Sequence, residues 1–343
     1  MLSFFDKTVA LNYLRFNKPK EAKIYLKEFL DNDSFDFNVD KYYIEFAEKE
    51  IEKAKEYNVQ LIPFYDEKYP NALSLLKDKP ILLYVKGDFI EFPKDAVAIV
   101  GSRKCTNYGK SVAYKIAYDL ASVGVSIVSG LAYGIDSAAH NGALDANGKT
   151  IAILGSGIDV IYPRDHLSLS RKIEENGFIV SEFPFGTEPM KYNFPFRNRI
   201  ISALSLGVIV VEAELKSGSL ITAMHAIEQG KEVFAVPGNI TSPTSLGTNA
   251  LIRDGAIPLL DVNDIFENIK ELNHLKLSKR IEEFSEIEQA ILNMLEDGDT
   301  FDTLKEKISS GDFLISDSEI LATLTTLEVR GYLKKTLGRY FKI

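Results

Sequence analysis

The chain of 343 residues has no tryptophan, four histidines and one cysteine. A single cysteine, Cys105, excludes a disulfide framework within the chain and leaves no cysteine cluster for a metal. No apolar run approaches the roughly 18 residues that span a bilayer. The opening segment, residues 1–16, interrupts its apolar runs with charge, which is unlike the core of a signal peptide. We therefore expect a cytoplasmic protein with no membrane contact.

Positive charge is in deficit, because 40 Lys and Arg oppose 49 Asp and Glu and give a net charge of −9. This balance argues against binding a polyanion, since nucleic-acid affinity comes from Lys and Arg that face phosphates. However, affinity follows the local field, so a small basic groove on an acidic body still binds DNA. The position of the basic residues matters more than their sum.

Catalytic and cofactor motifs are also missing. The chain has no Gly-x-x-x-x-Gly-Lys-Ser/Thr loop, which argues against ATP use. The Gly155-Ser156-Gly157 turn lacks the third glycine of the dinucleotide fingerprint. Metal-site spacing is absent among the histidines, which are His140, His166, His225 and His274. We predict a protein without a cofactor, a metal or an enzymatic activity.

What the sequence does contain divides into three parts. Residues 1–75 have helical apolar spacing over 17–30 and 39–57, with a loop at 35–40, and predict a small helical domain. Residues 76–272 carry short Val- and Ile-rich runs without alternation, separated by Gly-rich turns and by helices near 108–123 and 136–147. Such runs are typical of strands buried on both faces. This central part predicts an α/β, Rossmann-like, doubly wound parallel sheet.

The third part, residues 283–343, follows a helix at 261–269 and a charged linker at 270–280. Its pattern of three helices and a hairpin is the order of a winged helix. The third helix carries three acids and one base, whereas the hairpin is basic. We expect protein contact or weak backbone binding here, because an acidic helix is repelled by DNA phosphates. The charged residues concerned are Asp317, Glu319, Glu328 and Arg330 in the helix, and Lys334, Lys335, Arg339 and Lys342 in the hairpin.

Polar and glycine-rich loops follow several of the predicted strands. In an open parallel sheet these loops meet at the carboxyl edge, where helix N-termini offer N–H groups to phosphates. A single Ser-Gly-Ser at a helix start more often marks only an N-cap. Several such loops at one edge favour an anion site. The loops are Ser102-Arg103-Lys104, 129–136, 216–222 and 237–239.

The segment 191–202 places basic and aromatic residues at the start of a helix. Arg beside Phe is the combination that single-strand binding uses, with the guanidinium on phosphate and the ring on a base. Core packing is an equally good explanation for Phe194 and Phe196. One acid near the edge, Glu212, is a weak candidate base; turning the chain or tethering an Arg such as Arg199 explains it better.

Together these loops resemble the DprA/Smf family of DNA-processing proteins. The matching motifs occur in the family order over 97–103, 129–140, 154–163, 194–205, 210–223 and 236–240. The resemblance implies a homodimer, through the Rossmann-like domain, that binds single-stranded DNA, protects it and loads the RecA recombinase in natural transformation. It also implies an N-terminal SAM-like domain and a C-terminal winged helix. The implied DNA-binding residues are Ser102, Arg103, Ser129, Gly130, Lys191, Phe194, Arg197, Asn198, Arg199, Lys216, Ser217, Gly218 and Ser219, with Phe194 as the base-stacking ring.

Two other classes remain open. The same loops suit a nucleotide-processing enzyme of the phosphoribohydrolase type, but the Pro-Gly-Gly-x-Gly-Thr stretch of those enzymes is replaced here by Lys216-Ser217-Gly218-Ser219. The other class is an adaptor that binds the recombinase but no DNA. Release of free base from AMP separates the enzyme from the two binding proteins, and DNA binding separates those two from each other.

Overall fold

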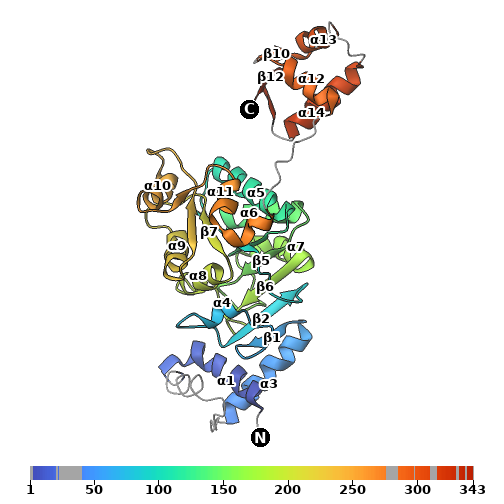
Figure 1. Cartoon of the computed structure of the whole chain (residues 1–343). Helices are drawn as coiled ribbons and strands as arrows, with labels where there is room; N and C mark the ends of the chain where they lie inside the picture. The colour runs from blue at the N-terminus through green and yellow to red at the C-terminus, as the bar shows by residue number, and fades with distance from the viewer. Residues whose placement is uncertain are drawn as a thin grey trace. The chain divides into compact units, whose positions relative to one another are not determined.

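The computed structural model describes residues 3–20, 22, 41–275, 285–296, 298–309, 315–329, 332–336 and 338–342. The chain forms two compact units, residues 1–276 and 277–343 (Figure 1). The loop expected at 35–40 lies outside the described residues, as does most of the helix expected at 17–30. Within the described part of the chain, no helix is long and apolar enough to cross a membrane.

A nine-stranded mixed sheet forms the centre of the first unit, in the order β1-β2-β6-β5-β4-β3-β7-β8-β9. Strands β3 to β9 pair in parallel, and β2 runs antiparallel to both β1 and β6. The predicted α/β class with a predominantly parallel sheet is confirmed. The strands are β1 (Gln60–Pro63), β2 (Leu82–Gly87), β3 (Ala96–Val100), β4 (Ser126–Ser129), β5 (Thr150–Ile153), β6 (Gly177–Ser181), β7 (Gly207–Val210), β8 (Glu232–Ala235) and β9 (Ile257–Pro258).

Burial on both faces explains why the strand sequences do not alternate. Every residue of β3 is buried, and so is every residue of its neighbours β4 and β7. Val97 of β3 pairs with Ile127 on one side and Gly207 on the other. Small and branched apolar side chains therefore fill both layers above and below the sheet.

Helices connect the parallel strands and cover the sheet. The chain runs outward from β3 to β6, returns to β7 and then runs outward in the other direction. Right-handed crossovers consequently put α5, α6 and α7 on one face and α8, α9 and α10 on the other. The strand order reverses between β3 and β7, which is where ligands bind in this class of fold. The helices are α5 (Asn107–Ser122), α6 (Ile135–Asp145), α7 (Leu167–Asn176), α8 (Asn193–Ala203), α9 (Gly218–Glu228) and α10 (Leu246–Arg253).

The N-terminal part contributes helices α1 (Phe4–Asn17), α3 (Lys41–Glu56) and α4 (Asn71–Ser74). Helix α1 begins at Ser3 in a capping box with Asp6, and packs against α3 (Figure 1). The strand β1, inside the range expected to be helical, was not predicted. It joins the edge of the sheet through β2, so the chain on both sides of residue 75 shares one sheet.

After β9, helix α11 (Asn263–Asn268) forms as predicted, and residues Lys270–Leu275 of the expected linker form a short 3-10 helix. The second unit contains the expected three helices and hairpin, with a short additional strand, β10, beside the hairpin. The acids Asp317, Glu319 and Glu328 are exposed on the third helix. The elements of this unit are α12 (Glu286–Met294), β10 (Asp299–Thr300), α13 (Phe301–Ser309), α14 (Asp317–Val329), β11 (Leu333–Thr336) and β12 (Arg339–Lys342).

Candidate nucleic-acid interface

A small pocket lies at the carboxyl edge of the sheet, between the loops that follow β3, β4 and β5 and the start of α8. The Arg103 guanidinium lies 4.8 Å from the centre of the Phe194 ring, within cation–π range. Gly155 makes room for this ring, because a side chain there would come within 2.8 Å of Phe194 Cδ1. The pocket wall includes Arg103, Gly130, Tyr133, Tyr162, Pro163 and Phe194.

Arg103 itself is exposed, and the loop before α5 holds its backbone in place. The Ser102 hydroxyl accepts a hydrogen bond from the Lys104 N–H at 3.1 Å, and the Ser102 N–H donates to the Glu212 carbonyl at 2.7 Å. The Ser102 side chain is buried, whereas the guanidinium of Arg103 reaches the pocket. This loop therefore presents a cation at the edge of the sheet.

Arg197 lies below the pocket and is buried, with 3% of the residue exposed. Its guanidinium donates to the carbonyl oxygens of Gly130, at 3.1 Å, and Ile153, which terminate β4 and β5. Burial lowers the pKa of Arg197 to about 10, although the charge of Asp136 opposes this shift. The group remains charged near neutral pH and links the ends of two strands to α8.

Ser129 and Gly130 direct their polar groups inward. The Ser129 hydroxyl donates to the Ile99 carbonyl at 2.6 Å, and the Gly130 N–H donates to Asp136 Oδ2 at 3.1 Å. The Asp136 carboxyl, at the start of α6, also accepts from the Ala132 N–H. A carboxylate of the chain itself thus occupies the N–H groups that were expected to meet a phosphate.

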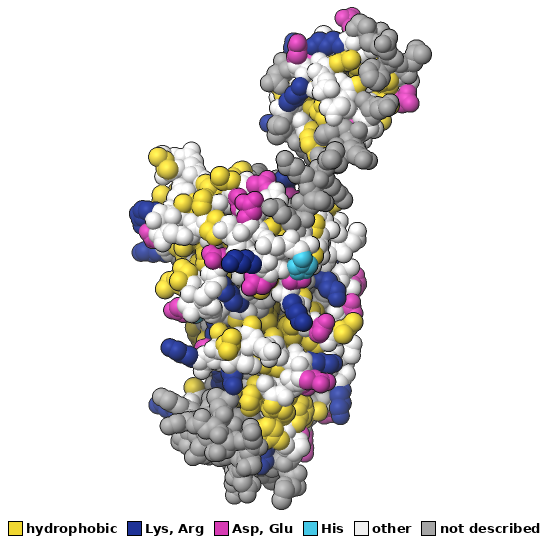
Figure 2. Space-filling view, viewed as in Figure 1, with side chains coloured by type: hydrophobic (Ala, Val, Ile, Leu, Met, Phe, Trp, Pro, Cys, Tyr) yellow, Lys and Arg dark blue, Asp and Glu magenta, His cyan; other side chains and the backbone are white. Residues whose placement is uncertain are grey.

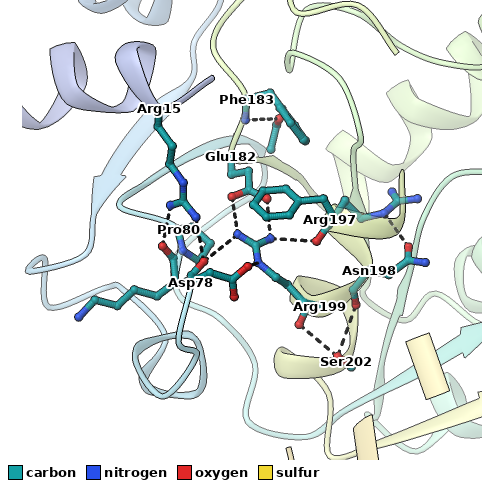
Figure 3. Close-up of polar contacts among 12 residues, drawn as sticks. Arg15, Asp78, Pro80, Glu182, Phe183, Arg197, Asn198, Arg199 and Ser202 are labelled. Carbon is teal, nitrogen blue, oxygen red and sulfur yellow. Dashed lines mark hydrogen bonds and ion pairs between the residues drawn. The ribbon is translucent and has the colours of Figure 1, made fainter. Parts of the chain in front are cut away.

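Arg199 does not line the pocket; its side chain points toward Asp78 and Arg15, in the N-terminal part of the chain (Figure 3). It makes a two-pronged ion pair with Glu182, at 2.6 and 2.7 Å, and a further ion pair with Asp78 at 3.0 Å. Burial opposes its charge, but these acids outweigh that effect and raise the pKa of Arg199. The alternating positions 197 and 199 therefore serve different parts of the fold.

The start of α9 forms a second polar surface at the same edge. Ser217 is the N-cap, and its hydroxyl lies 2.8 Å from that of Ser219. Lys216 and Gly218 are exposed there. Asn198 joins this turn to α8, because its side chain donates to the Gly218 carbonyl at 3.2 Å and accepts from Arg197 Nε.

Glu212 binds Thr106, the N-cap residue of α5, at the point where the strand order reverses. Its carboxylate accepts from the Thr106 N–H at 2.8 Å and from the Thr106 hydroxyl at 2.5 Å, just before α5. Gly109 is required beside it, since a Cβ there would lie 2.5 Å from the carboxylate carbon. Glu212 thus fixes the loop between β3 and α5. The expected alternative, a tether to Arg199, is wrong because Arg199 pairs with Glu182 and Asp78.

The pocket unites Arg103, Gly130 and Phe194, while Lys191 is exposed three residues before Phe194. Two pocket residues, Tyr133 and Tyr162, were not among the predicted site residues. Their only sequence signal was an aromatic residue in the loops after β4 and β5.

Figure 2 shows acidic and basic side chains interspersed over one face of the molecule. Among the described residues, no group of three His, Cys, Asp or Glu side chains is arranged to hold a metal.

The fold and the pocket define a Rossmann-like α/β protein with a cationic and aromatic site at the carboxyl edge of its sheet. The family model described as DNA recombination-mediator protein A matches residues 60–270, more than half of the chain. The chain therefore belongs to the DprA family of DNA-processing proteins.

Individual relatives agree with this assignment. Protein Smf of Escherichia coli is 46% identical over 66% of this chain and 62% of its own length. The DNA processing protein DprA of Bacillus subtilis is 44% identical over 64% of this chain and 74% of its own length. The match thus spans less than two thirds of the Escherichia coli protein.

Two solved structures share the fold. The X-ray structure of DprA from Streptococcus pneumoniae has a TM-score of 0.66 and 35% identity, and covers 78% of this chain and 99% of that one. A structure of DprA from Helicobacter pylori, described as giving insights into its single-stranded DNA binding mode, has a TM-score of 0.55 and 33% identity. It covers 63% of this chain and 97% of that one.

Proposed function

We propose that this chain binds single-stranded DNA in the pocket of Arg103 and Phe194 and performs no chemistry on it. The placement of an exposed guanidinium over a half-buried ring carries this proposal. Arg supplies a contact to phosphate, and an aromatic face takes a base regardless of its identity. The Helicobacter pylori relative, whose description concerns single-stranded DNA binding, supports the same assignment.

Side-chain burial separates the predicted site residues that contact DNA from those that hold the fold. Arg103, Lys191 and Lys216 have exposed side chains and make the phosphate contacts. Arg197, Asn198 and Arg199 are buried and position α8. Ser217 and Ser219 order the start of α9, where exposed N–H groups and the helix dipole add positive potential.

The contacts of Glu212 with the N-cap residue of α5 support a binding protein over a nucleotide-processing enzyme. The N-terminus of α5 at the strand-order reversal is the usual place for a nucleotide phosphate. Here the carboxylate of Glu212 takes the Thr106 N–H and hydroxyl, so a phosphate at that point meets negative charge.

At the biological level, we propose that the chain protects incoming DNA and loads the RecA recombinase in natural transformation, as a homodimer. The first unit exposes large apolar side chains that such protein contacts could use, at Met224, Ile227, Ile240 and Leu260. Sedimentation of the purified chain tests the dimer. Formation of RecA filaments on DNA covered by a single-strand binding protein tests loading, and no stimulation by this chain refutes it.

The binding proposal is tested by fluorescence anisotropy of labelled oligo(dT) over a salt series, with duplex DNA as competitor. We expect binding that duplex does not displace, and that weakens with salt by about 0.7 logarithmic units per phosphate contacted. Arg103→Ala lowers both affinity and salt slope. Arg171→Ala, which removes an exposed Arg on α7, is the matched control and leaves both unchanged. Absence of binding by the wild-type chain at low salt refutes the proposal.

A further inference from the structure

Two tyrosines border the small pocket beside Phe194. Tyr162 and Tyr133, on the loops after β5 and β4, are 41% and 42% exposed, although each contacts another ring. The centres of the Tyr162 and Phe194 rings are 5.6 Å apart and their planes are tilted by 41°. The tyrosine therefore continues the surface of Phe194 instead of covering it.

The loops that carry the two tyrosines are fastened to each other. The Tyr133 hydroxyl donates to Asp165 at 2.5 Å, and the Tyr133 ring meets the His166 ring edge-on at 5.0 Å. His166 Nδ1 in turn bonds to the Leu131 carbonyl at 2.9 Å. Because these contacts hold Tyr133 before any ligand arrives, a base that stacks on it costs little side-chain entropy.

Charge at this wall favours a nucleotide chain over an apolar peptide. Arg103 lies over the Phe194 ring, and Phe194 also lies within 6.0 Å of the Arg197 guanidinium. A row of π faces beside a surface cation is the arrangement that binds bases and phosphates of a single strand together. Duplex DNA keeps its bases stacked and paired, and cannot offer their faces to these rings.

From this geometry we infer that Tyr162 and Tyr133 extend the stacking surface of Phe194, so that at least two successive nucleobases stack on the exposed rings at the mouth of this small pocket. The inference rests on the proposed binding of single-stranded DNA and adds the residues that hold the second base. Tyr162 is the principal contact, because its ring adjoins Phe194. Tyr133 forms the outer wall.

The absence of tryptophan makes a direct test possible. Tyr162→Trp gives a protein with one tryptophan, whose emission a stacked base quenches. Tyr57→Trp is a closely matched control, since Tyr57 is 44% exposed and its ring lies 5.8 Å from that of Phe185 at a tilt of 42°. Saturating oligo(dT) should quench the emission of the Tyr162→Trp protein and leave that of the Tyr57→Trp protein unchanged. Equal quenching of both, or quenching of neither while anisotropy shows binding, overturns the inference.

Affinity provides the second measurement. Tyr162→Ala should weaken oligo(dT) binding by about 5- to 150-fold, the range for one stacked base, whereas Tyr162→Phe should keep it within about 2-fold. Tyr57→Ala should have no effect. Thermal melting of each variant identifies any loss of folding. If the wild-type chain fails to bind oligo(dT), the proposed function fails; if it binds and Tyr162→Ala binds equally well, only the inference fails.

Oligonucleotides with one abasic position supply the final distinction between phosphate and base recognition. An abasic site at either of two adjacent positions should weaken binding to the wild type. At one of these positions the abasic site should not weaken the binding of the Tyr162→Ala protein any further, because the ring on which that base stacks is already missing. If the losses of affinity from the abasic site and from Tyr162→Ala are additive at both positions, no second base stacks on Tyr162.

Discussion

At the residue scale, the basic side chains of the site separate into those that hold the fold and those that face solvent. Arg197 bonds to carbonyls at the ends of β4 and β5 and lies near the buried Asp136 carboxyl. Arg103 has no such role, because its guanidinium is exposed and lies against the Phe194 ring. We therefore expect different mutant phenotypes from two arginines with the same sequence-based expectation.

We predict that Arg197→Ala lowers the free energy of unfolding by about 3–5 kcal/mol, the usual loss when one member of a buried charged cluster is removed. Arg103→Ala changes it by less than about 0.5 kcal/mol, as for other exposed positions, yet weakens DNA binding. Urea unfolding and anisotropy on the same preparations check both statements. An Arg197→Ala protein with the same free energy of unfolding as the wild type would contradict the structural role of Arg197.

His140 provides a pH-dependent contribution to stability. The Thr150 hydroxyl donates to the Ile127 carbonyl at 3.0 Å, so it accepts from His140 Nδ1 at 2.7 Å. This leaves Nε2 unprotonated, and it is buried without a partner among the described residues. Burial lowers the pKa of His140 to about 3 from its ordinary value of 6.5.

Because the folded pKa lies below the unfolded one, this stabilisation is complete above pH 6.5 and is lost as the pH falls toward 3. Each pH unit removes at most about 1.4 kcal/mol through this group. We predict that the unfolding free energy of His140→Asn, measured from pH 7 to 4, falls less steeply than that of the wild type. Subtracting the two curves cancels other titrating groups such as Glu50 and Asp136. Parallel curves would show that His140 is not the titrating group.

At the element scale, helix α8 connects the pocket to the N-terminal helices. Phe196 contacts two guanidinium groups, with Arg199 at 3.9 Å and Arg15 of α1 at 5.8 Å from the ring centre. Arg15 also donates to the carbonyl of Lys79 and to that of Asp78, which is labelled in Figure 3. One turn of α8 thus holds Phe194 in the pocket and Phe196 against α1.

We predict that Phe196→Ala weakens the docking of α1, with a loss of about 1–2 kcal/mol in the free energy of local opening. Hydrogen exchange of the α1 amides measures this loss. Phe92→Ala removes an equally half-buried ring that packs against Phe89 and Phe178, so it serves as the control and should leave α1 protection unchanged. Equal hydrogen-exchange protection of α1 in both variants would show that the Phe196 contact does not stabilise the docking of α1.

The strands and the loops of the site could be predicted from sequence, and strand direction and side-chain orientation could not. Runs such as Ala96–Val100 are recognisable because burial on both faces requires continuous apolar residues. Strand β1 has four residues, and β2 runs against its neighbours, which no apolar pattern encodes. Burial of Arg197 and Arg199 depends on partners distant in the chain, such as Ile153 and Glu182.

At the scale of the whole molecule, the net charge of −9 requires that DNA affinity come from a local surface. The second unit offers a mixed surface, since α14 exposes Asp317 and Glu319 while the hairpin exposes Lys334 and Lys335. Opposite charges on one small unit largely cancel over a Debye length of about 10 Å at moderate salt. We therefore expect the first unit to carry the proposed single-strand affinity.

We predict that removing residues 283–343 changes oligo(dT) affinity by less than about 3-fold and leaves the salt slope unaltered, because the cut removes most of the second compact unit and spares the first unit, which contains the pocket. Anisotropy across a salt series compares the shortened chain with the full chain and with Arg103→Ala. A decrease in slope of about 0.7 per lost contact would instead place hairpin lysines on phosphates. In that case the double change Lys334→Glu and Lys335→Glu in the full chain should reproduce the decrease, which separates lost contacts from lost folding.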